Sequence, residues 1–348
     1  MALYPLLRPL IFALDAERAH LLSLKALAAA PAFAPVQKDP ALATQVAGLD
    51  FPNPVGLAAG YDKDALAPAQ LLGLGFGFVE VGTLTPLPQA GNARPRLFRL
   101  AEDQAVINRM GFNNGGLRAA ADRLGSRTRR GIVGVNIGAN KDSTDRIADY
   151  VAGVRTMMGI ADYLTINISS PNTPGLRALQ DRGALQELLG RVMDARGLGI
   201  PPIFLKVAPD LEPADIDDIA AVAIEQGIDG LIVSNTTISR PPLQSRFSSE
   251  TGGLSGAPLR TLALERLRDF RKATGGALPL IGVGGIASAE DAYARIRAGA
   301  SLVQLYSALV YEGPGLAKRI ATGLKALLAR DGFTTVAQAV GAEWRGVP

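Results

Sequence analysis

The sequence contains no cysteine and only one histidine, His20, among its 348 residues. Without cysteine the chain can form no disulfide, no thiolate zinc site, no cysteine-ligated iron–sulfur cluster and no cysteine nucleophile. A single histidine excludes a metal site with two histidine ligands, and it argues against a Ser-His-Asp triad unless His20 itself serves as the base. Proton transfer near neutral pH must therefore fall to carboxylates, lysine, tyrosine, serine, threonine or a cofactor.

A dense block of charge of one sign is also absent. The formal net charge is +4, from 36 basic and 32 acidic side chains that are mixed along the chain. The tightest basic cluster consists of Arg127, Arg129 and Arg130. This pattern predicts no nucleic-acid partner, because a nucleic-acid groove needs a concentrated positive surface, whereas it suits an anionic membrane surface.

No apolar run near the N-terminus reaches the roughly 18 residues that a membrane span needs, because charged residues interrupt each run. Two helical stripes are present: the first consists of Leu6, Leu7, Leu10, Ile11 and Leu14, and the second, which Pro31 ends, of Leu21, Leu24, Leu27 and Ala28. The layout is not that of a signal peptide. Two interpretations fit these stripes, a helical hairpin packed on the domain core or an amphipathic pair lying in a membrane interface. Residues 28–35 are rich in alanine, contain two prolines and predict a linker.

Short apolar runs alternate with helical patterns from residue 46 onward. The predicted strands are Val55–Ala59, Phe78–Gly82, Ile132–Ile137, Tyr163–Ile168, Ile203–Val207, Gly230–Val233, Leu280–Val283 and Leu302–Leu305. The helical patterns are Asp64–Leu72, Asp145–Met158, Ala184–Ala195, Pro213–Glu225, Leu259–Ala273, Ala289–Arg297 and Pro314–Leu328. This alternation indicates parallel βαβ units, and eight of them favour a closed (β/α)8 barrel of the TIM type over an open doubly wound sheet. Residues 44–51 predict a hairpin at the barrel floor, and no glycine-rich dinucleotide fingerprint follows the first strand.

Polar residues gather where the predicted strands end, which is where (β/α)8 barrels hold their chemistry. Asn136, Asn167 and Asn235 each end or closely follow a strand, although asparagine is depleted in strands. Three such positions predict a common pocket of amide donors and acceptors. Lys206 lies inside an apolar run, where an unpaired ammonium is costly, and therefore predicts an anionic ligand. Lys63 is a second candidate at the same mouth.

The last two predicted units contain a candidate phosphate site. The run Ile281-Gly-Val-Gly-Gly-Ile286 precedes a helix that begins near Ser288, and Leu305-Tyr-Ser307 ends the next strand. Glycines after strands seven and eight allow backbone N–H groups to converge on a phosphate, an arrangement that recurs in barrels.

Seven motifs follow one another along the chain. They are Asn53-Pro-Val-Gly-Leu-Ala-Ala-Gly-Tyr-Asp-Lys63, Asn108-Arg-Met-Gly-Phe112-Asn-Asn, Asn167-Ile-Ser-Ser-Pro-Asn-Thr-Pro-Gly175, Lys206-Val-Ala-Pro-Asp, Ser234-Asn-Thr-Thr, Thr251-Gly-Gly-Leu-Ser-Gly256 and Ile281-Gly-Val-Gly-Gly-Ile286. Together they resemble the dihydroorotate dehydrogenase family, from the first helix to about residue 330. The helical N-terminal extension, and Ser170 where the soluble class carries a cysteine base, resemble the quinone-dependent, membrane-associated class 2.

The resemblance implies oxidation of dihydroorotate to orotate in pyrimidine biosynthesis, with FMN as cofactor and ubiquinone or another membrane quinone as acceptor. Ser170 would remove the C5 proton while hydride leaves C6 for flavin N5. FMN would be bound by Ala59, Gly60, Tyr61, Asp62, Lys63, Thr83, Asn136, Asn167, Lys206, Ser234, Gly256, Gly285, Tyr306 and Ser307, and no metal is implied. Dihydroorotate would be bound by Lys63, Asn108, Arg109, Met110, Gly111, Phe112, Asn167, Asn172, Asn235 and Thr236.

The resemblance also implies a monomer that lies peripherally on the cytoplasmic side of the cell inner membrane. Residues 1–40 would form the membrane and quinone extension, and residues 41–348 the FMN-binding barrel. Serine is poorly matched as a base at pH 7, so we expect a relay from Ser170 through Thr173 or ordered water, with Phe112 excluding bulk solvent. His20 is expected away from the barrel motifs, in packing or at the quinone entrance.

Two positions depart from the family pattern. Tyr61 stands where leucine or phenylalanine is usual, and Ser234 replaces the usual threonine; neither change alters the expected activity.

Three other functions stay open at this point. A tRNA dihydrouridine synthase would need an RNA-binding extension, a basic stripe and a catalytic cysteine, and the chain lacks all three. A phosphate-binding barrel with aldol or isomerase chemistry would use Lys206 as a Schiff-base former. The third alternative is a membrane-bound barrel without catalytic activity.

Overall fold

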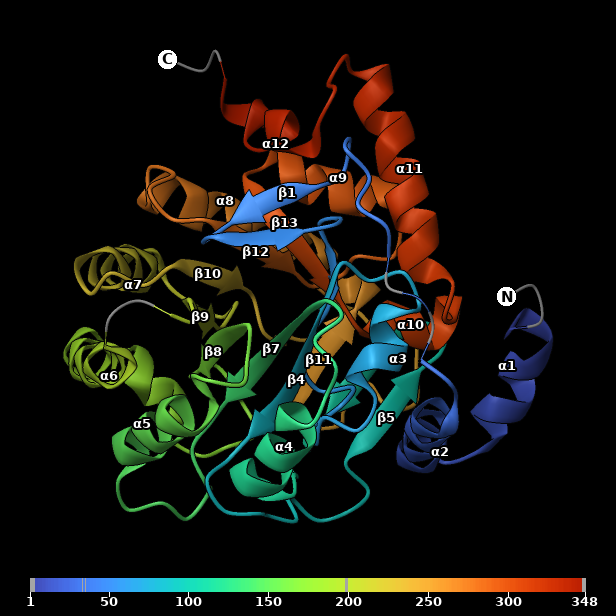
Figure 1. The fold of residues 1–348 in the computed structure, drawn as a ribbon. Coiled ribbons are helices and arrows are strands. Elements are labelled where there is room, and N and C mark those ends of the chain that lie inside the picture. Colours follow the sequence, from blue (N-terminus) through green and yellow to red (C-terminus); the bar gives the residue numbers. More distant parts are fainter. Residues whose placement is uncertain (1–3, 33, 35, 198–199, 346–348) are drawn as a thin grey trace.

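The computed structural model describes residues 4–32, 34, 36–197 and 200–345, and Figure 1 shows their fold. Eight parallel strands close into a barrel, which confirms the predicted fold class. In chain order they are β3 (Val55–Leu57), β4 (Phe78–Leu84), β7 (Ile132–Ile137), β8 (Tyr163–Asn167), β9 (Ile203–Val207), β10 (Gly230–Val233), β12 (Leu280–Val283) and β13 (Ala300–Leu305). Four of them have the predicted bounds. The prediction for β3 was two residues too long, because its pairing with β13 and β4 ends at Leu57.

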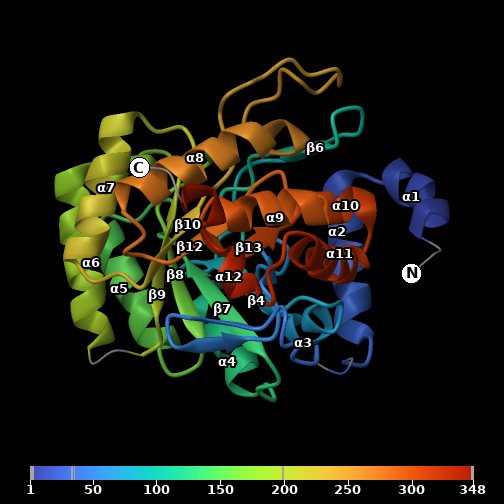
Figure 2. The same ribbon diagram turned by 90° about the horizontal axis from the view of Figure 1, so that it is seen from above.

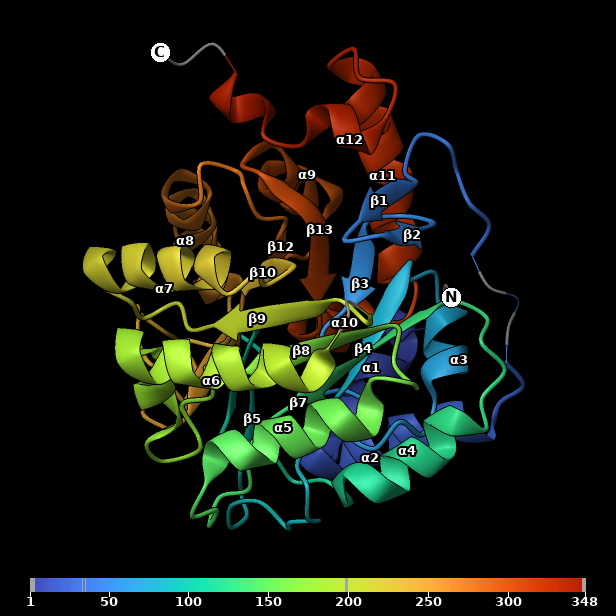
Figure 3. The same ribbon diagram turned by 60° about the vertical axis from the view of Figure 1, so that its left-hand side comes forward.

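Aromatic side chains fill the floor of the barrel. Phe78, Tyr163 and Phe204 stand near the starts of their strands, with ring centroids 6.2 Å apart for the first two and 5.3 Å for the last two. The hairpin of β1 (Thr44–Val46) and β2 (Leu49–Phe51) adds Phe51, whose ring meets Phe78 edge-on at 5.1 Å. The predicted floor hairpin is therefore confirmed (Figure 3), and the opposite end of the barrel is left for the site.

Helices cover the outside of the barrel. They are α4 (Gly116–Gly125), α5 (Arg146–Met157), α6 (Arg182–Arg196), α7 (Pro213–Glu225), α8 (Arg260–Ala273), α9 (Ala289–Arg297) and α11 (Leu316–Arg330), with the short α10 (Ser307–Glu312) and α12 (Val336–Ala339). Figure 2 shows α5, α6, α7 and α8 following one another around the barrel. Capping boxes begin α7 and α9, which is why both helices start where the sequence predicts. The helix α4 was not predicted.

One predicted helix is shorter than the sequence indicates. Residues 64–72 were predicted to be helical, but α3 spans Pro68–Leu72 only. The carboxylate of Asp62 accepts hydrogen bonds from the backbone N–H groups of Leu66 and Ala67, both at 2.8 Å. These hydrogen bonds keep the backbone before Pro68 out of the helical conformation, and Pro68 then supplies a favourable first helical position.

A second, antiparallel sheet of three strands was not predicted. It consists of β5 (Leu97–Leu100), β6 (Ala105–Asn108) and β11 (Gly253–Gly256), with β6 in the middle. The pairing of β6 with β11 joins segments that lie about 150 residues apart in the sequence. It brings the Asn108 motif beside the Gly256 motif.

The N-terminal helices α1 (Tyr4–Ala13) and α2 (Ala16–Ala29) lie against this sheet and α10, at the right of Figure 1. Helix α2 buries Glu17, Ala19 and Leu24, whereas α1 buries no residue, and Leu6 and Leu10 are 73% and 71% exposed. Part of the predicted linker, residues 33 and 35, lies outside the described residues. No helix in the described part of the chain is both long and apolar enough for a membrane span.

Candidate active site

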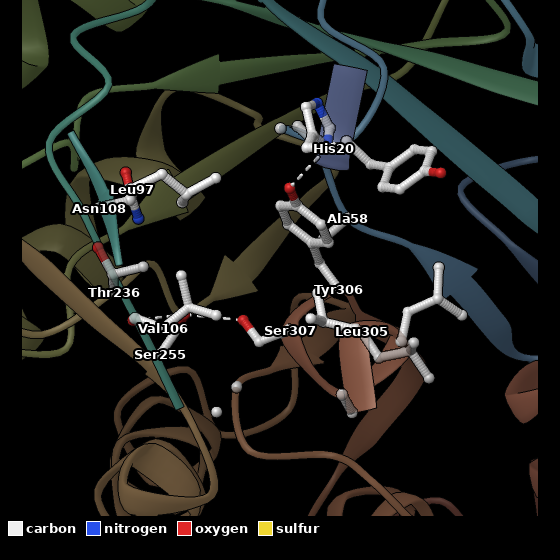
Figure 4. A pocket seen from close by; sticks show the side chains of 18 of the residues that line it. His20, Ala58, Leu97, Val106, Asn108, Thr236, Ser255, Leu305, Tyr306 and Ser307 are labelled. Atoms are coloured by element: carbon white, nitrogen blue, oxygen red, sulfur yellow. Dashed lines mark hydrogen bonds between the residues drawn. The ribbon is translucent and has the colours of Figure 1, made fainter. Parts of the chain in front are cut away.

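One cavity of about 510 Å³ opens at the carboxyl ends of the barrel strands, a volume typical of small-molecule sites. Figure 4 shows part of its lining, which comes from the strand ends, the three-stranded sheet and the N-terminal helices. Twenty of the predicted site residues line it: Ala59, Gly60, Tyr61, Lys63, Thr83, Asn108, Met110, Gly111, Phe112, Asn167, Ser170, Asn172, Lys206, Ser234, Asn235, Thr236, Gly256, Gly285, Tyr306 and Ser307.

Three predicted residues do not line the cavity. Asp62 is buried and accepts the backbone hydrogen bonds described above, and burial raises its pKa. Arg109 turns to Glu250, with which it forms a salt bridge of 2.7 Å. Asn136 lies one layer below the cavity. The structure thus gives Asp62 and Arg109 contacts that hold loops in place.

The three predicted asparagines form one hydrogen-bonded chain. Asn167 Nδ2 donates to Asn136 Oδ1 at 3.0 Å and to Thr83 Oγ1 at 3.1 Å. Asn235 Nδ2 donates to Asn167 Oδ1 at 3.4 Å and to Ser169 Oγ at 2.9 Å. The prediction that these strand-end amides meet is therefore confirmed, although Asn136 supports the others from below.

A buried carboxylate, Glu80, lies under these amides and was missed in the sequence. It accepts hydrogen bonds from Asn136 Nδ2 at 2.7 Å, Tyr163 Oη at 3.0 Å and Gln304 Nε2 at 2.9 Å. The signal that could have found it is the one that singled out Lys206, a charged residue inside an apolar strand.

Lys206 is buried near this carboxylate. Burial lowers the pKa of Lys206, and Glu80 opposes that effect. The Lys206 ammonium forms no hydrogen bond or salt bridge with the residues that the structure describes.

Unpaired backbone donors gather at the end of the cavity near β12 and β13. Within the described residues, the N–H groups of five cavity-lining positions donate no hydrogen bond: Gly284, Gly285, Ile286, Tyr306 and Ser307. Ser307 Oγ donates to Ser255 Oγ at 2.7 Å beside them (Figure 4). Such a set of N–H and O–H donors suits a phosphate.

Two arginines behind this turn were also missed in the sequence. The fully buried Arg295 donates to the carbonyl oxygens of Gly284 at 2.8 Å and Arg260 at 2.7 Å, and Arg260 donates to that of Gly285 at 3.1 Å. Burial lowers the pKa of Arg295 to about 10. Gly285 has a φ of +69°, and a Cβ atom there would collide with the Arg260 backbone, so only glycine allows this close approach.

Ser170 lies in the turn after β8 and is 6% exposed. Its Oγ accepts a hydrogen bond from the Asn172 N–H at 3.2 Å. The nearby Thr173 hydroxyl is buried and has no hydrogen-bond partner among the described groups. Arg177, which was missed in the sequence, ties this turn to its surroundings, because it donates to the carbonyl oxygens of Ser169 at 3.1 Å and Thr236 at 3.2 Å.

The predicted substrate residues meet on the side of the three-stranded sheet. Asn172 Nδ2 donates to Asn108 Oδ1 at 3.2 Å, and Lys63 Nζ donates to the Gly60 carbonyl oxygen at 2.6 Å. Burial lowers the pKa of Lys63 to about 8, while Glu17 raises it and Arg96 lowers it. The arrangement offers one cation and several amides to a small planar anion.

The expectation that His20 lies away from the barrel motifs is wrong. Its ring meets that of Tyr61 edge-on at 5.1 Å, and the Tyr306 hydroxyl lies 3.4 Å from His20 Nδ1 (Figure 4). Tyr61, the departure from the family pattern, lies with its hydroxyl 2.9 Å from Ser23 Oγ of α2. Burial lowers the pKa of His20 to about 3. Helix α2 packs directly onto the strand ends, a contact that local patterns do not encode, and His20 therefore lines the cavity.

Comparisons with known proteins agree with these features. A family model described as dihydroorotate dehydrogenase matches residues 41–328. A dihydroorotate dehydrogenase (quinone) of Erythrobacter litoralis is 65% identical over 98% of this chain and 100% of that protein, and one of Novosphingobium aromaticivorans is 63% identical over 99% and 100%. The crystal structure of a DHODH from Eimeria tenella in complex with ferulenol superposes with a TM-score of 0.90, at 43% identity over 95% of this chain and 96% of that one.

Proposed function

The chain belongs to the quinone-dependent class of the dihydroorotate dehydrogenase family, and on that premise we propose that it oxidises dihydroorotate with FMN as its flavin, Ser170 as its base and ubiquinone as its acceptor. The observation that carries the proposal is the cavity at the strand ends, whose parts suit the three partners. Unpaired N–H groups and Lys206 suit a flavin phosphate and ring, amides and Lys63 suit orotate, and the helical wall suits a quinone.

The donor set fits FMN. The phosphate would be held by the N–H groups at Gly284, Gly285 and Ser307, and the ring system by the strand-end residues around Asn167 and Lys206. When bound, FMN would supply the hydride acceptor for the oxidation of dihydroorotate. The Lys206 ammonium would stabilise negative charge on the reduced flavin ring. Since it has no other partner among the described residues, its charge is available for that purpose.

Substrate recognition and proton removal are assigned to the neighbouring polar residues. Orotate is a flat anion with carbonyl and ring N–H groups, and asparagine amides offer donors and acceptors together while Lys63 pairs with the carboxylate. Ser170 removes the C5 proton, and we assign its onward transfer to the Thr173 hydroxyl or water, since the Thr173 oxygen is buried, forms no hydrogen bond with the described groups and is free to accept one. Phe112 helps to exclude bulk solvent from this step.

The N-terminal helices are assigned to quinone and membrane. Residues 1–40 would form that extension and residues 41–348 the catalytic barrel, and a quinone would enter between α1 and α2 and approach His20 and Tyr306. Leu6, Leu7 and Leu10 present an exposed apolar face beyond this wall. This face supports a peripheral place on a membrane, and we propose that the protein lies there as a monomer, on the cytoplasmic face of the inner membrane. The family membership excludes the RNA-modifying, aldolase-like and non-enzymatic alternatives.

The proposal is tested by the colour and reactivity of the purified protein. We expect a yellow protein with an FMN spectrum that dihydroorotate bleaches without oxygen and that ubiquinone then restores. A released cofactor without a phosphate would contradict the FMN assignment. A colourless protein that added FMN does not reconstitute would overturn the whole proposal.

Exposed leucines of α1 are expected to govern membrane binding. In the double variant Leu6→Ser and Leu10→Ser, co-sedimentation with anionic vesicles should fall strongly, because two large apolar contacts with the acyl chains are lost. Turnover with a short-chain soluble quinone should stay unchanged. The matched control is Ile200→Ser with Ile224→Ser, which removes exposed apolar side chains near α6 and α7. Equal loss of vesicle binding in the control would contradict the role of α1.

Orotate affinity is expected to fall as the pH rises above about 8. Below its pKa of about 8 Lys63 is cationic and pairs with the carboxylate, whereas above that value it loses its proton and this attraction. The measurement is the Kd of orotate, taken from the change in flavin absorption across this pH range. Lys63→Arg keeps its charge throughout and should show a flat profile. The same fall in both proteins would refute the assignment to Lys63.

A further inference from the structure

Glu17 is a buried carboxylate in a helix that otherwise serves the quinone end of the cavity. It lies in the first turn of α2, is 5% exposed and does not line the cavity. Its oxygens accept hydrogen bonds from Arg96 Nη2 at 2.7 Å, from Arg96 Nε at 3.1 Å and from Arg94 Nη2 at 2.9 Å. Arg96 is buried and Arg94 is largely exposed. The tight, charge-assisted contact is therefore the two-pronged one to Arg96.

The other edge of the Arg96 guanidinium holds the loop between β4 and β5. Arg96 Nη1 donates to the carbonyl oxygens of Ala90 at 2.6 Å and Asn92 at 2.8 Å. Gly91, between them, leaves no room for a Cβ atom beside the Met110 carbonyl oxygen and Arg96. One guanidinium thus joins helix α2 to this loop, and removing the carboxylate would leave a buried cation paired with carbonyl dipoles alone.

The same loop holds both substrate-binding segments. Asn92 Nδ2 donates to the carbonyl oxygens of Arg109 at 3.0 Å and Asn172 at 3.2 Å, and the Asn92 N–H donates to that of Met110 at 3.0 Å. Asn108 and Asn172, which line the cavity, are in turn joined at 3.2 Å. Glu17, Arg96 and Asn92 therefore connect α2 to the site side chains by consecutive hydrogen bonds.

We propose that Glu17 is a positioning residue for dihydroorotate, so that the N-terminal helices take part in substrate oxidation as well as in quinone reduction. The inference rests on the proposed function of the cavity. Without the Glu17 carboxylate, Arg96 no longer anchors the loop to α2, and the Asn108 and Asn172 side chains lose a fixed support. Loss of the Glu17 anion also lowers the pKa of Lys63, which keeps Arg96 as a cationic neighbour and has Asp62 and Asp64 as its other acidic neighbours.

The test is the reduction of the flavin by dihydroorotate in the full-length holoenzyme, without quinone or oxygen. In Glu17→Gln we expect the dihydroorotate concentration for half-maximal reduction to rise by roughly three- to thirtyfold, which lies within the range of effects for residues that share a hydrogen-bond network. The limiting rate and the flavin content should change much less. Glu17→Asp, which keeps the charge, should recover part of the affinity. The matched control is Glu343→Gln, because Glu343 also accepts two hydrogen bonds from one arginine, Arg268, at 2.6 and 3.1 Å, and does not line the cavity.

A second variant keeps the inference testable if Glu17→Gln fails to fold. Asn92→Ala breaks the last link and leaves the ion pair intact, so it should raise the half-saturating concentration similarly, and the double variant should add little to either change. The inference would be overturned if folded Glu17→Gln needed the same dihydroorotate concentration for half-maximal reduction as the wild type. It would also be overturned if the effects of Glu17→Gln and Asn92→Ala added fully in the double variant. If dihydroorotate fails to reduce even the wild-type protein, the proposed function fails instead.

Discussion

Replacing Ser170 with alanine is expected to slow the reduction of the flavin by dihydroorotate by roughly 10²–10⁴-fold, the contribution of a positioned general base. Ser170 lines the cavity, and the chain has no cysteine and no second histidine that could take over proton removal. The flavin should stay bound, because the N–H groups near β12 and β13 do not depend on Ser170. The measurement is the anaerobic rate of flavin bleaching at saturating dihydroorotate, together with the flavin content of the variant.

Ser169→Ala is the matched control for this experiment. The Ser169 hydroxyl donates to Asn167 Oδ1 at 3.0 Å and accepts from Asn235, and it does not line the cavity. We expect weaker substrate binding with a limiting rate that changes far less than in Ser170→Ala. Normal reduction in Ser170→Ala would contradict the assignment of the base, and an equal loss in both variants would indicate damage to the asparagine chain instead.

Deleting residues 1–35 is expected to abolish turnover with quinone while dihydroorotate still reduces the flavin. Helices α1 and α2 contribute one wall of the cavity, which consists of Tyr4, Ile11, Ala16, Ala19, His20, Ser23, Ala26 and Leu27. The other walls come from the barrel and the three-stranded sheet, so the flavin and substrate ends remain. The measurement is steady-state turnover with a water-soluble short-chain quinone, beside the anaerobic half-reaction with dihydroorotate.

The soluble quinone separates two effects of the deletion. Loss of membrane binding alone would leave turnover with the soluble quinone intact, which is also the outcome expected for the double variant Leu6→Ser and Leu10→Ser. Because the deletion also removes Glu17, the concentration of dihydroorotate for half-maximal reduction should rise while the limiting rate persists. Quinone kinetics that survive the deletion would show that the acceptor site lies elsewhere.

Much of the fold could be predicted because its signals are local. The strands β9, β10 and β12 and the helices α7 and α9 have the predicted bounds, since apolar runs and capping residues stand within a few positions of one another. The strand-end asparagines could be predicted to meet, because parallel strands in a closed barrel bring their carboxyl ends to one rim. The length of α3 could not be predicted, because hydrogen bonds to the Asp62 side chain, rather than helix propensity, fix the backbone conformation before the helix.

The sequence alone determined the order of the strands, the seven motifs and the absence of cysteine. The strand order led to the barrel and the motifs to the family, and the missing cysteine pointed to the class in which we propose Ser170 as the base. The tertiary structure decided which distant segments meet there. It brings His20 to Tyr306, pairs β6 with β11, places Arg177 behind the Ser170 turn and joins Glu17 to Arg96. These contacts depend on how α2 and the long loops pack over the rim, and side-chain periodicity records only that a face is buried, not which partner covers it.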